Sequence, residues 1–203
     1  MAGGSDPISI AARIWCMHNS SMRLTLFAAL AAFIAGCGDS RNEQKGPVPM
    51  PANVQTATFS GGCFWGVEDL IRKVEGVVDT EVGYTGGHLE NPTYDDTHDS
   101  ASGHAEAVQV KFDPAKVSYE HLLQLFFRLH DQTTLNSQGN DKGTQYRSAI
   151  FYHNEEQKKI AEKVKDEVNK SGKWKNPVAT TLEPFTKWWP GEEYHQDYLQ
   201  KNP

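Results

Sequence analysis

Alternation of apolar and polar residues divides the chain into short strands and helices. Residues 54–59 alternate weakly and predict a strand. Apolar residues then recur at three- and four-residue spacing from Phe64 to Val74, which predicts a helix that ends at Gly76. Residues 77–84 predict a second strand. This part of the chain is therefore expected to form a strand–helix–strand unit.

The second half of the chain continues the mixture of strands and helices. It predicts strands at 105–112, 146–153 and 178–183, and helices that begin after Ser118 and Asn154. Asn154 and Gln157 resemble a capping box, and Gly172 ends the second of these helices.

Two long polar segments, residues 85–104 and 131–145, are predicted to be loops, and loops of such length in a compact domain are usually functional. From Pro184 onward the aromatic C-terminal tail is expected to be irregular. Strands and helices at this spacing predict an α+β fold, a two-layer ferredoxin-like sandwich of a mixed sheet with covering helices.

The N-terminal region has the pattern of a targeting segment. Residues 24–34 form an uncharged apolar block that follows Arg23, and the run 34–37 resembles a bacterial lipobox ending at Cys37. A core helix is the alternative interpretation. We expect a signal peptide with a lipidated Cys37 at residues 1–37, a flexible polar linker at 38–53 and one catalytic domain at 54–203.

These features predict a location at the bacterial cell envelope, with the membrane reached only through an N-terminal lipid anchor. A cytoplasmic location is the alternative if the apolar block is not a signal. A permanent transmembrane helix is excluded, because the chain has no apolar run of about 18 residues.

Composition and charge exclude several other classes. Hydrophobic residues make up 38% of the 203 residues, which is typical of a globular protein. A net charge of −6 with no dense Lys/Arg stripe gives no reason to expect a nucleic-acid partner. Three cysteines cannot build a disulfide framework, and no Cys/His cluster has metal-ligand spacing, so no metal site is expected.

Cys63 is the main candidate for chemistry. It lies in Gly61-Gly62-Cys63-Phe64-Trp65-Gly66, where the first strand gives way to the helix. A helix N-terminus stabilises an anion, so we expect a lowered pKa for this thiol; an inert buried cysteine is the alternative. A cysteine hydrolase would need a histidine base, and spacing alone nominates neither His104 nor His195.

The motif around Cys63 resembles the signature of the A-class peptide methionine sulfoxide reductases. The resemblance runs from about residue 56 to residue 202. Further matching blocks follow in order at residues 83–87, 91–94, 103–108, 138–141, 143–148 and 194–199.

This resemblance implies a reaction and a set of catalytic residues. The enzyme would reduce methionine-S-sulfoxide, free or in proteins, to methionine through a sulfenic acid on Cys63, and so repair oxidised proteins. Glu106 would protonate the departing oxygen, which requires a carboxyl that stays protonated near neutral pH. Tyr94 and Tyr146 would donate hydrogen bonds to the same oxygen.

The resemblance also implies substrate-binding residues. Phe64 and Trp65 would form the wall for the substrate methyl group, and Asp141 would support the site and partner recognition. His195 and Gly62 would support these residues without contacting the substrate.

Regeneration of Cys63 is expected to need a thiol from outside the chain. Many members of the family resolve the sulfenic acid with a second cysteine, but the first such position holds His98 here and the C-terminus has no cysteine. We therefore expect no cofactor other than an external reductant such as thioredoxin, glutaredoxin or a small thiol. A thiol peroxidase and a lipid-tethered binding module for methionine side chains are the alternative functions.

Overall fold

The computed structural model describes residues 51–99 and 101–203. The predicted signal peptide, Cys37 and nearly all of the predicted linker lie outside the described residues. Among the helices that are described, none has the length and apolarity needed to cross a membrane.

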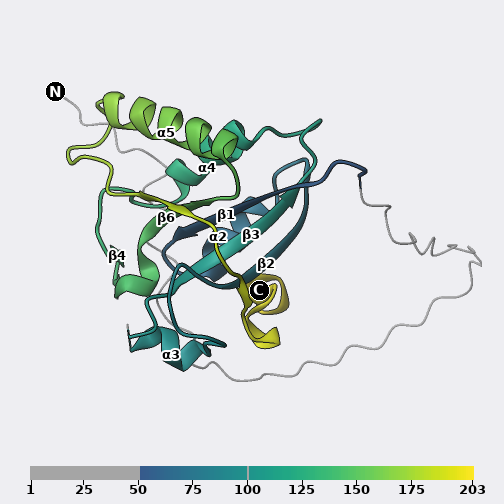
Figure 1. Cartoon of the computed structure of the whole chain (residues 1–203), viewed down its shortest axis with the longest axis vertical. Helices are drawn as coiled ribbons and strands as arrows, with labels where there is room; N and C mark the ends of the chain where they lie inside the picture. Colours follow the sequence, from purple (N-terminus) through teal and green to yellow (C-terminus); the bar gives the residue numbers. More distant parts are fainter. Residues whose placement is uncertain (1–50, 100) are drawn as a thin grey trace, which may run out of the picture.

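A mixed six-stranded sheet forms the centre of the fold, in the order β7-β6-β1-β3-β2-β8 (Figure 1). Its strands are β1 (Gln55–Gly61), β2 (Val77–Thr85), β3 (Ala105–Phe112), β6 (Ser148–Tyr152), β7 (Thr181–Pro184) and β8 (Trp189–Pro190). All neighbouring strands are antiparallel except β6 and β7, which are parallel because α5 connects them.

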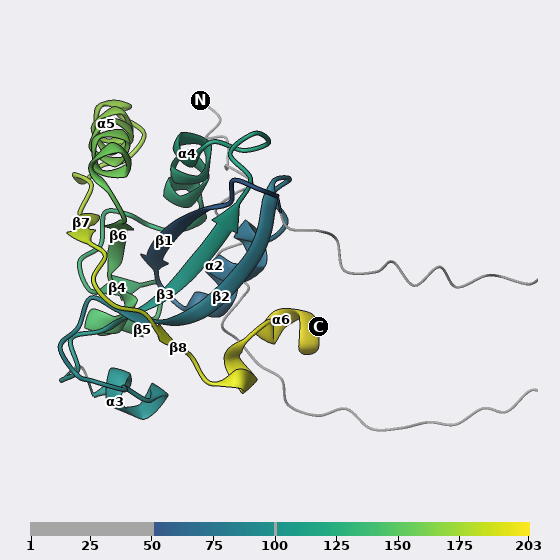
Figure 2. The ribbon, with the colours of Figure 1, turned by 45° about the vertical axis from the view of Figure 1, so that its right-hand side comes forward.

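Three helices pack on one face of this sheet: α2 (Phe64–Ile71), α4 (Tyr119–Leu129) and α5 (Glu155–Lys170). Figure 2 shows α4 and α5 side by side above one end of the sheet. The main core lies between helices and sheet, where Phe59 of β1 stacks on Phe126 of α4 with ring centroids 5.0 Å apart. The predicted α+β sandwich of a mixed sheet and covering helices is confirmed.

The other face of the sheet carries a smaller core. Alanines of β3 and β6 surround Phe151 there, and Phe185 and Trp188 of the C-terminal tail pack against them. The tail therefore covers the sheet surface that the helices leave open.

The predicted helix starts are confirmed, with one difference in detail. The Ser118 hydroxyl accepts a hydrogen bond from the backbone N–H of His121, and the Asn154 side chain accepts one from the N–H of Gln157. The Gln157 side chain does not bond back to Asn154. It accepts from the N–H of His153 and donates to the carbonyl of Thr56, so it ties α5 to β1.

The two predicted loops contain short elements that the pattern does not reveal. In the first, α3 (Tyr94–His98) begins at a capping box made by Thr93 and Asp96. The second contains β4 (Ser137–Gln138), β5 (Asp141–Lys142) and the 3-10 helix η1 (Thr144–Tyr146), so the predicted strand at 146–153 begins later, at Ser148.

The C-terminal tail is also less irregular than predicted. It pairs with β2 through β8 and then forms the 3-10 helix η2 (Glu193–His195) and α6 (Tyr198–Lys201). These short elements were missed because side-chain caps and distant pairing stabilise them, rather than a repeated apolar face.

Candidate active site

Cys63 occupies the N-cap position of α2, two residues beyond the end of β1. Gly62 has φ +94°, in the region that favours glycine. A Cβ atom at Gly62 would also lie only 2.6 Å from Cγ of Gln138. The turn that presents Cys63 therefore requires glycine at position 62.

The thiol of Cys63 is partly buried, and burial is the main reason why its pKa is raised to about 12. The charge of Glu106 adds to the increase, whereas backbone N–H groups of Trp65 and Gly66 lower the pKa. The prediction of a lowered pKa is wrong, because desolvation outweighs the helix N-terminus. The resting cysteine is therefore a neutral thiol.

Glu106 lies on β3 and is buried, with an exposed fraction of 1%. Its Oε2 accepts a hydrogen bond from the backbone N–H of Phe64 at 3.1 Å. Burial raises the pKa of this carboxyl to about 8; the Phe64 hydrogen bond opposes the increase, and Asp141 adds to it. The carboxyl is therefore protonated at neutral pH, as an acid catalyst at this position requires.

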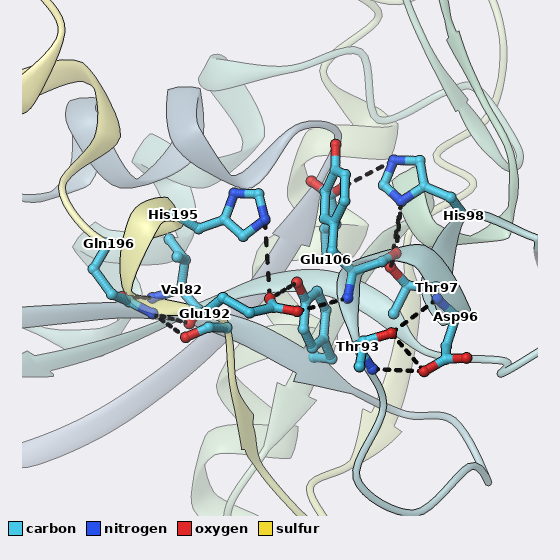
Figure 3. A network of polar contacts seen from close by, with 12 residues as sticks. Val82, Thr93, Asp96, Thr97, His98, Glu106, Glu192, His195 and Gln196 are labelled. Atoms are coloured by element: carbon cyan, nitrogen blue, oxygen red, sulfur yellow. Dashed lines mark hydrogen bonds and ion pairs between the residues drawn. The ribbon is translucent and has the colours of Figure 1, made fainter.

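Both tyrosines named from the sequence lie beside Glu106. His98 joins them: its Nε2 lies 3.8 Å from Oε1 of Glu106 (Figure 3). The same nitrogen lies 3.0 Å from the hydroxyl of Tyr146, and Nδ1 lies 2.9 Å from the carbonyl oxygen of Tyr94. Burial raises the pKa of Tyr94 to about 12 and that of Tyr146 further, so both hydroxyls keep their protons.

Asp141, on β5, lies near Cys63, Glu106 and His98. Burial raises the pKa of its carboxyl, and nearby His98 opposes the increase. Asp141 in turn raises the pKa of Cys63 and of Glu106. It therefore contributes negative charge to the site.

Aromatic rings form the wall next to Cys63. Phe64 packs against His195 with ring centroids 5.1 Å apart, and Trp65 stacks on Tyr198 at 3.7 Å. The indole N–H of Trp65 donates to Nδ1 of His195 at 3.1 Å. His195, predicted to lie behind the substrate-binding residues, is buried and holds both Phe64 and Trp65 in place.

Sequence reasoning missed Glu192, which connects the tail to the site. One carboxylate oxygen accepts a hydrogen bond from the hydroxyl of Tyr84, and the other accepts from the backbone N–H of Tyr94 (Figure 3). These partners are about a hundred residues away, so no local pattern marks Glu192. Tyr198 was missed as a site residue although it falls in a matching block.

The two histidines considered as a base for Cys63, His104 and His195, are engaged elsewhere. Nδ1 of His104 accepts from the N–H of Gly87, and its Nε2 lies 2.8 Å from the carbonyl of Leu89, so both nitrogens are engaged by backbone. Nδ1 of His195 is occupied by Trp65. Within residues 51–99 and 101–203, no group of three or more His, Cys, Asp and Glu side chains is arranged to hold a metal ion.

Residues 55–203 match the family model described as peptide methionine sulfoxide reductase. The chain belongs to this family. The peptide methionine sulfoxide reductase MsrA of Methanothermobacter thermautotrophicus is 54% identical over 149 residues, covering 73% of this chain and 88% of the relative. In Rhodopirellula baltica, peptide methionine sulfoxide reductase MsrA 2 is 51% identical over 149 residues, with coverage of 73% and 86%.

Solved structures of sulfoxide reductases share the fold. Reduced Mxr1 from Saccharomyces cerevisiae superposes with a TM-score of 0.71 at 41% identity, covering 76% of this chain and 88% of the yeast chain. Methionine sulfoxide reductase A of Corynebacterium diphtheriae has a TM-score of 0.66 at 34% identity, with coverage of 75% and 77%. Mxr1 in complex with Trx2 matches with a TM-score of 0.52 at 31% identity, with coverage of 76% and 91%.

The family resemblance and the enzyme class inferred from the sequence are confirmed. As a peptide methionine sulfoxide reductase, the protein is a thiol-dependent oxidoreductase that reduces methionine sulfoxide and so repairs oxidised methionine.

Proposed function

We propose that the domain at residues 54–203 reduces methionine-S-sulfoxide, free or in proteins, through a sulfenic acid on Cys63. The observation that carries the proposal is the start of α2. There the thiol of Cys63 is followed directly by Phe64, whose backbone N–H binds the buried, protonated Glu106. A nucleophile and a proton donor thus meet at one point beside an aromatic wall.

In the proposed complex, the substrate methyl group contacts Phe64 and Trp65. The tilted arrangement of these rings, with centroids 6.4 Å apart, suits a small apolar group rather than a stacked ring. The sulfoxide oxygen receives hydrogen bonds from Glu106 and Tyr94, and from Tyr146 when its hydroxyl is turned toward this oxygen; the hydroxyl and carboxyl protons of all three are retained at neutral pH.

The remaining predicted site residues support this arrangement. Gly62 permits the turn that presents Cys63, and His195 fixes the indole of Trp65. The negative charge of Asp141 favours the protonated form of Glu106. Asp141 also contributes to recognition of partners.

The first chemical step transfers one oxygen atom. The sulfur of Cys63 attacks the sulfoxide sulfur and loses its proton, while Glu106 protonates the oxygen. The hydroxyl group then moves from the substrate sulfur to the sulfur of Cys63, and the transient S–S bond breaks with its electron pair going to the methionine thioether. Cys63 is left as a sulfenic acid, and the thiol proton replaces the one that Glu106 gave. Because the resting pKa of Cys63 is about 12, the thiolate forms in the substrate complex rather than beforehand.

The second stage uses an external thiol. Cys63 is the only cysteine that the structure describes, so no disulfide partner lies within residues 51–99 and 101–203. A thiol attacks the sulfenic acid to give a mixed disulfide and water, and a second thiol releases the reduced enzyme. The complex of the yeast relative with Trx2 supports a thioredoxin-type donor; glutaredoxin or a small thiol would serve the same chemistry.

Single-turnover kinetics with chiral methionine sulfoxide test the proposal. Without reductant, the wild-type protein is expected to release one methionine per molecule from the S epimer, none from the R epimer, and to leave a dimedone-reactive Cys63. The Cys63→Ser variant, with a hydroxyl in place of the thiol, should give no methionine. Methionine formation by that variant, or peroxide consumption with no sulfoxide reduction by wild type, would contradict the assignment.

For the N-terminal region we propose a signal peptide at residues 1–37, lipidation of Cys37 and a flexible tether at 38–53. Support comes from the apolar block at residues 24–34 with small residues before the cysteine. Mass spectrometry of the native protein should find an acylated N-terminus at Cys37 in the membrane fraction, and Cys37→Ala should remove the acyl group. A mature protein that keeps residues 24–36 and carries no acyl group would support a cytoplasmic location instead.

A further inference from the structure

His98 lies in the candidate site, at a position where the family resemblance implies a second cysteine. It is the last residue of α3, and its side chain points toward Glu106 (Figure 3). The same side chain contacts the hydroxyl of Tyr146. The inference developed for this residue rests on the proposed function, because it concerns how the sulfoxide oxygen is bound.

The backbone fixes which nitrogen of His98 carries hydrogen in its neutral form. Nδ1 lies 2.9 Å from the carbonyl oxygen of Tyr94. A carbonyl oxygen can only accept a hydrogen bond, so Nδ1 must be the N–H donor. In neutral His98, Nε2 therefore carries a lone pair, and the proton that His98 gains on acidification is added at Nε2.

Nε2 is the nitrogen that faces Tyr146, with the hydroxyl oxygen 3.0 Å away. When Nε2 has a lone pair, the Tyr146 hydroxyl donates its hydrogen to His98. When Nε2 is protonated, it donates to the Tyr146 oxygen, and the hydroxyl hydrogen becomes free for another acceptor. The direction of this one hydrogen bond thus depends on the charge of His98.

We propose that His98 is a positioning residue: its protonated form turns the Tyr146 hydroxyl toward the sulfoxide oxygen, and its neutral form turns it away. The sulfoxide oxygen then has three donors when Nε2 of His98 is protonated and two when it is not. The His98 side chain is 31% exposed to solvent.

The charged surroundings of His98 come from several elements. Oε1 of Glu106 on β3 lies 3.8 Å from Nε2, and its carboxyl is neutral below about pH 8. The carboxyl of Asp141 interacts favourably with protonated His98, and a positive charge on His98 disfavours protonation of His195. The other titratable groups near it are Tyr94 and Tyr146, with Asp95, Asp96 and Asp99 on or next to α3.

The pH dependence of single-turnover rates tests this inference without interference from thiol recycling. The variant His98→Gln can donate a hydrogen bond to Tyr146 but cannot titrate. The ratio of wild-type to variant rate should fall about tenfold or more between pH 5 and 8, as expected for loss of one donor to the oxygen. His121→Gln, on the exposed start of α4, is the matched control and should give a flat ratio.

A second substitution shows whether Tyr146 carries the effect. In a Tyr146→Phe background, the same His98→Gln comparison should give a ratio that does not change with pH. A ratio that still falls would overturn the inference, because His98 would then act on Glu106 directly.

The tautomer can be measured on the unmodified protein. Nitrogen-15 NMR of neutral His98 should show hydrogen on Nδ1, and hydrogen on Nε2 would overturn the inference even if the variants fail to fold. Wild-type protein that forms no methionine would refute the proposed function itself. Normal turnover with a flat wild-type to His98→Gln ratio would refute only the role of His98.

Discussion

Two buried carboxyl groups lie near α2, and their surroundings differ. Glu106 is 1% exposed and Glu68 is 2% exposed, and burial raises the pKa of both. Glu68 accepts hydrogen bonds from Arg72 at 2.8 Å, Thr80 at 3.1 Å and the backbone N–H of Asp197 at 3.2 Å. Among the described residues, Glu106 accepts a hydrogen bond only from the backbone N–H of Phe64.

The comparison distinguishes Glu68, which stabilises the fold, from Glu106, which the proposed function uses as an acid. The charge of Arg72 and the hydrogen bonds from Thr80 and Asp197 lower the pKa of Glu68 against the effect of burial. Within the part of the chain that the structure describes, Glu106 forms no ion pair with Lys or Arg; the one basic side chain at ion-pair distance is His98, at 3.8 Å, and the carboxyl keeps its proton to about pH 8. Burial alone therefore does not mark a functional acid, whereas burial without an Arg or Lys partner does.

Replacing each carboxyl by its amide is the sharpest test of this distinction. Glu106→Gln should slow the first turnover by about 10²- to 10⁴-fold, because an amide cannot give a proton to the sulfoxide oxygen. The fold should survive, since the amide oxygen can still accept from Phe64. Rapid-quench measurement of methionine checks the rate, and a rate equal to wild type would remove Glu106 from this role.

The pH dependence of the free energy of unfolding should also show that Glu106 is protonated in the folded protein. Its folded pKa of about 8 lies above the ordinary value of 4.5, so the folded protein keeps a proton that the unfolded chain loses. Stability should therefore fall as pH rises from about 4.5 to 8, by a few kcal/mol at about 1.4 kcal/mol per pKa unit. Urea unfolding of wild type and Glu106→Gln across this range measures the effect, and the variant should show the flatter curve.

The same amide substitution at Glu68 should affect stability instead of chemistry. Glu68→Gln leaves Arg72 partly buried with a weaker partner, which should cost about 2–3 kcal/mol of unfolding free energy. The first-turnover rate of the folded variant should stay within about threefold of wild type. A large loss of rate with unchanged stability would show that the distinction between the two carboxyls is false.

The smallest effect is expected from Thr80→Val, which keeps the shape of the side chain but removes a hydroxyl that donates to Glu68 and accepts from Arg72. A loss of about 1–2 kcal/mol is expected for these two hydrogen bonds. Denaturant midpoints measured beside Glu68→Gln provide the comparison. Equal losses in the two variants would mean that the charge of Glu68 contributes nothing.

The sequence alone predicts the elements that bury a repeated apolar face. The strand at 105–112 has its predicted bounds, and the next helix begins after Ser118 as predicted, because their apolar residues recur at the spacing of a strand and a helix. The short helix at Tyr94–His98 and strand β8 were missed, because a capping box and pairing with β2 stabilise them.

The site was predicted unevenly for a related reason. Cys63, Phe64 and Glu106 were named from motifs, and the structure brings them together. The pKa of Cys63 was predicted in the wrong direction, because burial by distant segments is invisible in a local motif. Glu192 reaches the site only through the folding of the tail against β2.

The thiol of Cys63 is partly buried, and Cys63 is the only cysteine among the described residues, which under the proposed mechanism has a kinetic consequence for the working life of the enzyme. After each reduction of a substrate, its sulfur would stay in an oxidised form until a second molecule arrives. In that interval peroxide competes with the thiol donor, and further oxidation to the sulfinic acid is irreversible for most proteins. The average number of substrates repaired per molecule is then the ratio of two bimolecular rates, so scarcity of reductant shortens the enzyme's lifetime as well as slowing it.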